Sequence, residues 1–420
     1  MVLDACKDRQ ISPTRAGVAL AGIFIAERII LAIAGVRFNI DALSWYWQIL
    51  DPVLLREHLF ESLIFLHAQP PLFNLGVGMA LKLAPGEVNW LLHGFFLCLG
   101  LGLALVLYSG LLELTWPPRT AALAVAVAAL TPGWVVYEHW FFYDFPVLFL
   151  LAGACVALLR FARTGRWGSL GIFVAAVATV ALTRSLFHLV WVLGSIVILL
   201  VFQPRLRVRR AVTVLLLPVL LVAGWYAKNQ LMFGFFGPSS WLGLSLAKTA
   251  TARLDPADRE AMVSSEVLSP YALVKPFSPL EDYESAAGSR FPDSEIGALG
   301  QRLKSTGNPN LNHLGFVDVS AQSRADALEV IVRQPKVYRR SVGTAVRRFF
   351  SSAVAYPPFL DNLVVMAPIY QLGEKTWSSP PVVAAAFLGA LVISILTAMR
   401  AFRLGQGAEL SLRLWVIWTL

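Results

Sequence analysis

Long apolar runs dominate this chain and restrict what it can fold into. A run of about 16–22 residues, as found here, crosses ~30 Å of hydrocarbon as a helix. Backbone groups inside a bilayer must pair within their own segment, so each run is expected to be helical. We therefore predict an all-α polytopic membrane protein. The predicted spans lie near 16–36, 88–109, 119–135, 145–160, 167–183, 186–202, 211–228 and 380–399, with another beginning near 411.

The charged residues are few and are distributed as in membrane proteins. Hydrophobic residues make up 57% of the chain and charged residues 15%, against about 45–50% and about 25% in soluble domains. The net charge of +9 comes mostly from arginines in short loops, a bias typical of the cytoplasmic side. We therefore predict no nucleic-acid partner. The clusters predicted to be cytoplasmic are Arg160, Arg163 and Arg166; Arg205, Arg207, Arg209 and Arg210; and Arg400 and Arg403.

The N-terminus has the pattern of an uncleaved signal anchor. Lys7, Arg9 and Arg15 precede about twenty apolar residues, a longer core than that of a cleaved signal peptide. The N-terminus is thus predicted to be cytoplasmic. The cysteines show no pattern of a disulfide framework or a metal site; they are Cys6, Cys98 and Cys155.

Counting the crossings places two acidic residues on the same side of the membrane. If Arg160 is cytoplasmic, the run 145–160 begins outside, and Asp144 lies there. The first run starts in the cytoplasm, so Asp41 is outside as well. The run 71–84 then cannot cross the membrane. Because it is short and opens on prolines, we predict an interfacial or re-entrant helix.

A second surface helix is predicted before that run. Asp51 and Pro52 have the pattern of an N-cap followed by proline at the first helical position, and the turns up to residue 66 mix leucines with charged residues. Further on, a regular helix is predicted from Val319 to Phe350. The predicted parts are a cytoplasmic tail 1–14, a transmembrane module 15–228 with an external loop 38–87 holding two juxtamembrane helices, a mixed external region 229–379, and C-terminal transmembrane segments 380–420.

Polar and ionisable side chains gather at the predicted external face. Such groups are costly at membrane depth and by default indicate function. Lys228 and Arg184 could clamp a lipid phosphate with their positive charge, or simply snorkel towards water. His67 could serve a site or satisfy backbone groups at a proline corner. The candidates are Asp41, His67, Gln69, Glu138, His139, Asp144, Arg184, His188 and Lys228.

Asp41 is the candidate base. It could take a proton from an acceptor hydroxyl, or it could cap a helix that starts near Ala42. Asp144 could likewise cap the span that it precedes, or it could belong to a site. The aromatic residues within 137–143 could stack on a substrate or form an aromatic belt at the headgroups.

Two further patterns concern metals and buried charge. The histidines have no metal-binding spacing, although two facing acids could hold a divalent cation, Mg²⁺ or Mn²⁺, beside a phosphate. Glu27 and Arg28 lie inside the first span, where neighbouring helical positions point about 100° apart. We therefore expect each to find a partner on another helix, in a structural role.

Several of these segments together resemble a known superfamily. The chain is similar to GT-C-fold glycosyltransferases, the superfamily of protein O-mannosyltransferases and the lipid A aminoarabinose transferase. It is closest to the bacterial dolichyl-phosphate-mannose-transferase-like subgroup, over most of residues 15–250. The segments are Asp41 after the first span, HAQPPLFN at 67–74, TPGWVVYEHWFFYDFP at 131–146, LTRSLFH at 182–188, and WYAKNQLMFGFFGPSSWLGLSLAK at 225–248.

The resemblance implies a GT-C-like helical bundle and an inverting transfer of a sugar from polyprenyl phosphate. Asp41 would be the catalytic base, Asp144 a supporting acid, and Trp241 would join the other candidates in binding substrate. The acceptor hydroxyl would belong to a glycan, lipid or protein, on the extracytoplasmic face of the plasma (inner) membrane. Many relatives have two consecutive acids where Ala42 follows Asp41 here. Relatives also continue beyond the run at which this chain ends, so we expect a truncated chain.

Two other function classes remain open at this point. A transporter or flippase for a lipid-linked or anionic solute would use the same basic and aromatic groups without chemistry. Transporters often have paired halves with broken helices, which we do not find in the sequence. A membrane scaffold would need none of the external acids.

Overall fold

Helices account for the regular structure of a computed structural model that describes residues 12–202, 208–350, 359–368, 371, 380–404 and 407–419. No strand occurs in these ranges, only two isolated bridges. The predicted tail with Cys6, Lys7 and Arg9, and the basic residues Arg205 and Arg207, lie outside them. Within the described ranges, four helices are long and apolar enough to cross a membrane: α1 (Pro13–Ala34), α6 (Val88–Glu113), α9 (Asp144–Thr164) and Leu215–Phe233 within α12 (Val208–Phe233). The prediction of an all-α, multi-pass membrane protein is confirmed at this level.

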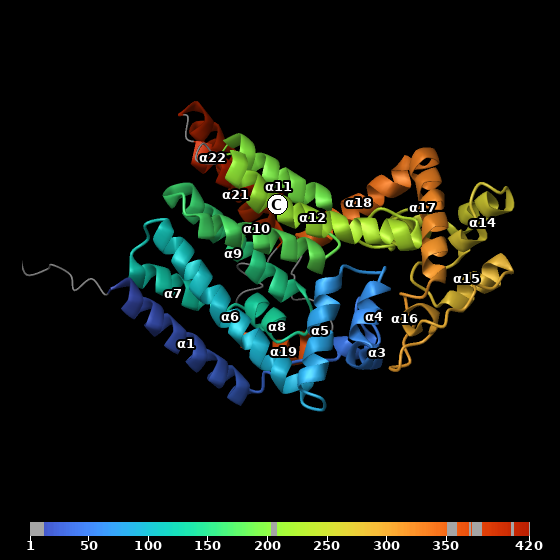
Figure 1. Cartoon of the computed structure of the whole chain (residues 1–420), viewed down its shortest axis with the longest axis horizontal. Coiled ribbons are helices and arrows are strands. Elements are labelled where there is room, and N and C mark those ends of the chain that lie inside the picture. The colour runs from blue at the N-terminus through green and yellow to red at the C-terminus, as the bar shows by residue number, and fades with distance from the viewer. Residues whose placement is uncertain are drawn as a thin grey trace, which may run out of the picture.

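Further apolar helices belong to the bundle (Figure 1). The indole of Trp415 is buried and donates to the Ser195 hydroxyl at 3.1 Å, so the last helix is joined to the bundle interior. These helices are α10 (Trp167–Thr183), α11 (Leu189–Phe202), α21 (Pro380–Arg403) and α22 (Gly407–Thr419).

The predicted span 119–135 is wrong as a single helix. It forms α7 (Pro118–Ala129) and α8 (Pro132–Glu138), which are bent by 65° at the break between them. Pro132 lacks a backbone N–H and disfavours helical geometry at Thr131, whose ψ is 141°. The proline therefore accounts for the break.

The loop after α1 holds the predicted surface helices in altered form. The Asp51 carboxylate accepts from the Val53 backbone N–H at 2.8 Å, which confirms the predicted N-cap. The single helix expected up to residue 66 is instead broken at His58, whose φ of −123° is not helical. The helices are α2 (Ala42–Trp45), α3 (Pro52–Glu57), α4 (Leu59–Ile64) and α5 (Pro71–Leu83), the last being 13 residues and too short to cross a bilayer.

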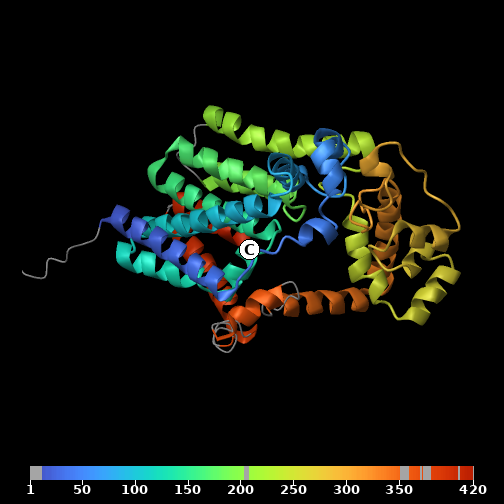
Figure 2. The ribbon, with the colours of Figure 1, turned by 90° about the horizontal axis from the view of Figure 1, so that it is seen from below.

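The region after α12 packs beside one end of the bundle, which we call the loop end (Figure 2). The regular helix expected over 319–350 is wrong in one respect. It is interrupted between Gln334, with ψ of 59°, and Pro335, because proline cannot continue the hydrogen-bond ladder. The helices are α13 (Leu242–Thr249), α14 (Pro256–Ser264), α15 (Leu280–Ala287), α16 (Gly297–Gly300), α17 (Gly315–Arg333), α18 (Pro335–Phe349) and α19 (Leu360–Val365), with 3₁₀ turns η1 (Thr251–Arg253) and η2 (Pro270–Leu273).

Residues 302–312 join this region to the loop after α1. Buried Lys304 donates to the carbonyls of Tyr46 and Ile49 at 2.8 and 2.7 Å. The side-chain oxygen of Asn312 accepts from the backbone N–H groups of His67 and Ala68 at 2.9 and 3.0 Å. The loop's conformation is therefore set by a segment more than 230 residues away in the sequence.

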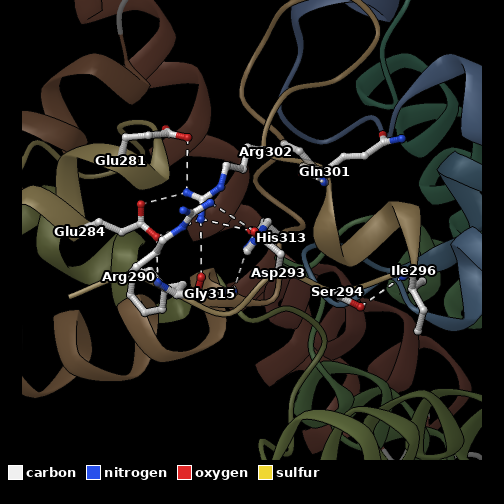
Figure 3. Close-up of polar contacts among 12 residues, drawn as sticks. Glu281, Glu284, Arg290, Asp293, Ser294, Ile296, Gln301, Arg302, His313 and Gly315 are labelled. Atoms are coloured by element: carbon white, nitrogen blue, oxygen red, sulfur yellow. Dashed lines mark hydrogen bonds and ion pairs between the residues drawn. The ribbon is translucent and has the colours of Figure 1, made fainter.

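An ion-pair network holds the segment that makes this joint (Figure 3). The Arg302 guanidinium donates to both carboxylate oxygens of Glu284 at 2.9 and 3.0 Å, and to Asp293 at 3.2 Å. These charge-assisted bonds lower the pKa of Glu284 below its ordinary value. The network connects α15 to the loop that leads into α17.

The backbones of α13 and α17 approach each other closely at Gly243, and a stability prediction follows from this contact. A Cβ added at Gly243 would lie 1.7 Å from the Ser320 carbonyl oxygen. Gly243→Ala is therefore expected to force the helices apart and to lower the free energy of unfolding by about 1–3 kcal/mol, measured by thermal or denaturant unfolding in detergent. Gly343→Ala is the matched control, because its added methyl meets open space. Equal stability of the two variants would contradict the close approach.

Candidate functional site

Two loops that the sequence places on one side of the membrane are paired through their backbones. The Asn39 N–H donates to the His139 carbonyl at 2.8 Å, and the Phe141 N–H donates to the Asn39 carbonyl at 2.9 Å. This short parallel bridge brings the segment before Asp41 against the segment before Asp144. Both acidic residues therefore lie at the loop end of the bundle.

Asp41 presents a free carboxylate. Its side chain is exposed and makes no hydrogen bond or ion pair with the residues that the structure describes. Helix α2 starts at Ala42, yet the Asp41 carboxylate forms no capping bond, so the capping interpretation is wrong. Trp45 and Trp47, further along the same loop, are 37% and 40% exposed, so the loop that carries Asp41 also presents aromatic surface.

Asp144 is paired with Arg184, both about one-third exposed. Asp144 is the first residue of α9 but makes no capping bond, and Arg184 follows directly after α10. The guanidinium also lies 5.2 Å from the Tyr143 ring centre. Within the described ranges, no group of three or more acidic, histidine or cysteine side chains is placed to hold a metal ion.

The aromatic residues after α8 belong to the core. Trp140, Phe141, Phe142 and Tyr143 are all buried, at 3%, 1%, 6% and 8% exposure, so they form neither an open stacking surface nor a headgroup belt. Tyr46 stacks on Phe142 at 4.2 Å between ring centres. Phe142 in turn lies 3.9 Å from Tyr143 between ring centres, so packed rings connect the loop that carries Asp41 to the residue before Asp144.

An apolar groove of about 570 Å³ runs beside these loops. It is formed by α5 together with the loop-end halves of α6, α9 and α10, and its walls are almost entirely hydrocarbon. Phe141 and Thr183 belong to its lining; the first bonds to Asn39, and the second precedes Arg184. The groove therefore has the Asp41 loop beside one part of its wall and the Asp144–Arg184 pair beside another.

Glu138 lies in the bundle interior, paired with Arg28. The Arg28 guanidinium donates twice to the fully buried Glu138 carboxylate, at 2.8 Å each, and once to the Ala129 carbonyl at 3.1 Å. The expected inter-helix partner of Arg28 is thus confirmed. Glu27 has no such partner on another helix that the structure describes. Its carboxylate lies 3.5 Å from Arg28 itself, so the expectation of a separate partner is wrong. The angle of about 100° between neighbouring helical positions does not exclude this contact, because the long Arg28 side chain bends back towards Glu27.

Arg28 therefore stabilises the broken helix. It bonds to the last residue of α7 and to the last residue of α8, on either side of the 65° bend. His139 follows directly, is buried, and donates from Nδ1 to the Val135 carbonyl at 2.8 Å. Its own carbonyl accepts from Asn39. These contacts position the second loop rather than present polar groups to a ligand.

His67, Lys228 and Trp241 form a joint between α12, the first loop and the external region. His67 is fully buried and its Nδ1 lies 2.8 Å from the Ser240 hydroxyl. The Lys228 ammonium donates to the Leu66 carbonyl and lies 3.8 Å from the Trp225 ring centre. The Trp241 indole donates to the Leu311 carbonyl at 3.1 Å. We find no hydrogen bond from the buried Gln69 side chain to a described residue, and His188 is exposed.

The buried imidazole of His67 should make the stability of the protein depend on pH. Burial, helped by the Lys228 charge, lowers the pKa of His67 to about 3. The unfolded chain binds a proton near pH 6.5 and the folded chain does not, so stability is present above pH 6.5 and is lost as the pH falls towards 3. The loss is expected to be up to about 1.4 kcal/mol per pH unit. Denaturant unfolding at falling pH measures the free energy of unfolding. In His67→Gln this free energy should depend less on pH than in the native chain, and an unchanged pH dependence would contradict the assignment.

The ten candidates therefore separate into distinct sets. Asp41 is exposed on the loop that bonds to the groove residue Phe141, and the Asp144–Arg184 pair, about one-third exposed, follows the groove residue Thr183. Glu138 and His139 lie in the interior, and His67, Lys228 and Trp241 form the joint. Gln69 and His188 belong to none of these sets. Sequence reasoning missed Lys304 and Asn312, whose roles rest on distant contacts. It also missed the groove walls on α6, α9 and α10, because their apolar residues look like any other span.

Comparisons with protein-family models, with curated proteins and with solved structures give no match to this chain.

Proposed function

We propose that this protein is a GT-C-type glycosyltransferase that moves a sugar from polyprenyl phosphate to a hydroxyl acceptor. The observation that carries the proposal is the apolar groove beside the Asp144–Arg184 pair and the Asp41 loop. A polyprenyl chain needs a hydrocarbon surface, its phosphate needs a cation, and the acceptor hydroxyl needs a base. The three features meet at the loop end of one bundle.

In the proposed reaction the Asp41 carboxylate takes the proton of the acceptor hydroxyl. The hydroxyl oxygen attacks the anomeric carbon from the face opposite the phosphate, and the bond from that carbon to the phosphate oxygen breaks. The products are an inverted glycoside and polyprenyl phosphate. A carboxylate without a hydrogen-bond partner among the described residues suits this role, since nothing there competes for its lone pairs.

Arg184 would hold the departing phosphate. A guanidinium has five N–H donors, and the bond to Asp144 is made from Nη1. The N–H groups on the other nitrogens of Arg184 would donate to the phosphate oxygens. Asp144 would orient Arg184 as its supporting acid. Lys228, which the sequence suggested as a second phosphate partner, already bonds to the Leu66 carbonyl, so we assign it to the joint.

The direct test uses purified protein, radiolabelled polyprenyl-phosphate sugars and membrane extract. Transfer of label to an extract component supports the proposal and identifies the sugar and the acceptor. Absence of transfer from every donor offered, by protein that is folded, would contradict it. Replacing Mg²⁺ or Mn²⁺ by EDTA tests whether a divalent cation takes part.

Filling the groove should impair the use of donor lipid. Gly76 lines the groove and has open space where a side chain would begin. Gly76→Trp is therefore expected to lower transfer at limiting donor by about tenfold or more, equal to about 1.4 kcal/mol of binding. Gly94→Trp, on an exposed part of α6 outside the groove, is the matched control. Equal KM values for the donor in the two variants would count against a lipid in the groove.

A flippase is the second candidate, because one observation favours it. The broken pair α7–α8 is a feature of many transporters. A flippase would move polyprenyl-phosphate sugar between leaflets, and Asp41→Asn would leave that movement unchanged. Translocation of a fluorescent polyprenyl phosphate by reconstituted protein distinguishes the two functions.

A further inference from the structure

Helix α18 has two chemically opposite faces. At 100° per residue, Tyr338, Val342, Val346 and Phe349 form one stripe along the helix. Three of them are well exposed, Val342 at 42%, Val346 at 50% and Phe349 at 64%. The helix also carries five basic residues and no acidic residue: Lys336, Arg339, Arg340, Arg347 and Arg348.

The apolar stripe has little protein to cover it. None of the 15 residues of α18, all of them described, is buried. Val337 packs beside η1 and η2 at the first turn, which attaches the N-terminal end to the external region. Beyond that turn the helix extends along the periphery of the molecule (Figure 2).

The far end of α18 meets an apolar helix that the sequence predicts to cross the membrane. The rings of Phe349 and Phe350 each lie 5.6 Å from the ring of Phe387 in α21, measured between centres. Phe387 lies two turns inside that helix. The C-terminal end of the exposed stripe of α18 therefore contacts a helix that the sequence predicts to cross the membrane.

We propose that α18 lies on the bilayer surface at the loop end, with its apolar stripe in the acyl boundary and its basic face on anionic phospholipid headgroups. An amphipathic helix with a strongly basic polar face is the type that binds this interface. Each basic residue near an anionic surface strengthens binding by about fivefold. The contact with α21 provides continuity with the membrane, which a separate protein partner would not explain.

The test measures the depth of fluorescent labels in the full chain. Single cysteines at Val342 and Gly343, adjacent in sequence but on different faces, are labelled after replacement of Cys6, Cys98 and Cys155. The protein is reconstituted in phosphatidylcholine vesicles with and without phosphatidylglycerol. With phosphatidylglycerol, a lipid-borne quencher should act several-fold more strongly at 342 than at 343, and aqueous iodide should show the reverse. A label at Val346 should repeat the result for 342.

The charges are tested separately from the apolar stripe. Arg340→Gln with Arg347→Gln removes two of the five basic residues, so it should reduce lipid quenching at 342 several-fold and should weaken its dependence on phosphatidylglycerol. Equal access of iodide to 342 and 343 would overturn the proposal, since it means that the stripe is in water. A label at 342 shielded from both quenchers would also overturn it, because another protein surface would then cover the helix.

Discussion

Asp41→Asn is expected to abolish sugar transfer while the chain stays folded. Asparagine keeps the shape of the side chain but cannot accept the acceptor's proton, and loss of a general base costs about 10²–10⁴-fold in rate. The native carboxylate is exposed and bonds to no described residue, so its neutralisation removes no stabilising contact. Transfer from labelled polyprenyl-phosphate sugar measures the rate, and thermal unfolding measures the fold.

The matched control is Asp258→Asn, which changes another exposed acidic residue, at the start of α14 in the external region. It should retain full transfer. If the Asp41→Asn variant were fully active, Asp41 could not be the base, and the proposed reaction would have no assigned base. If Asp41→Asn stopped transfer but left the binding of polyprenyl phosphate unchanged, the role of Asp41 would lie in the chemistry rather than in lipid binding.

Arg28→Met is expected to give the largest loss of stability. It leaves the Glu138 carboxylate buried without its cation and the Ala129 carbonyl without its donor. Breaking one partner of a buried ion pair costs about 3–5 kcal/mol. Because Arg28 connects the ends of α7 and α8, the loss should include the bend that holds the second loop. Thermal or denaturant unfolding in detergent micelles measures the change.

Two comparisons separate burial from charge. Arg160→Met removes an ion pair with Glu113 in which the arginine side chain is 44% exposed, and it should cost less than about 1 kcal/mol. The double variant Arg28→Met with Glu138→Met should recover much of the loss, because no charge is then left unpaired. Equal losses for Arg28→Met and Arg160→Met would contradict the assigned role of the buried pair.

The features foreseen without a structure are those decided by near neighbours in the chain. The apolar runs predict helices because hydrocarbon offers no partner for the backbone. Asp51 before Pro52 predicts a cap that is present, since the bond spans only two residues. The breaks at Pro132 and Pro335 are equally local, but hydropathy alone does not reveal them, because a proline inside an apolar run leaves the run apolar.

The partners of the polar residues depended on the tertiary structure. Arg28 clearly needed an acid on another helix, yet nothing in the chain singled out Glu138, which lies 110 positions away. His67 and Lys228 looked like members of a site and prove to hold the first loop against α12. Each such pairing depends on which helix faces come together, and hydrophobicity alone treats many of those faces as equivalent. Local solvation thus determined the helices, and long-range packing decided which charges were paired internally and which, like Asp41, stayed exposed.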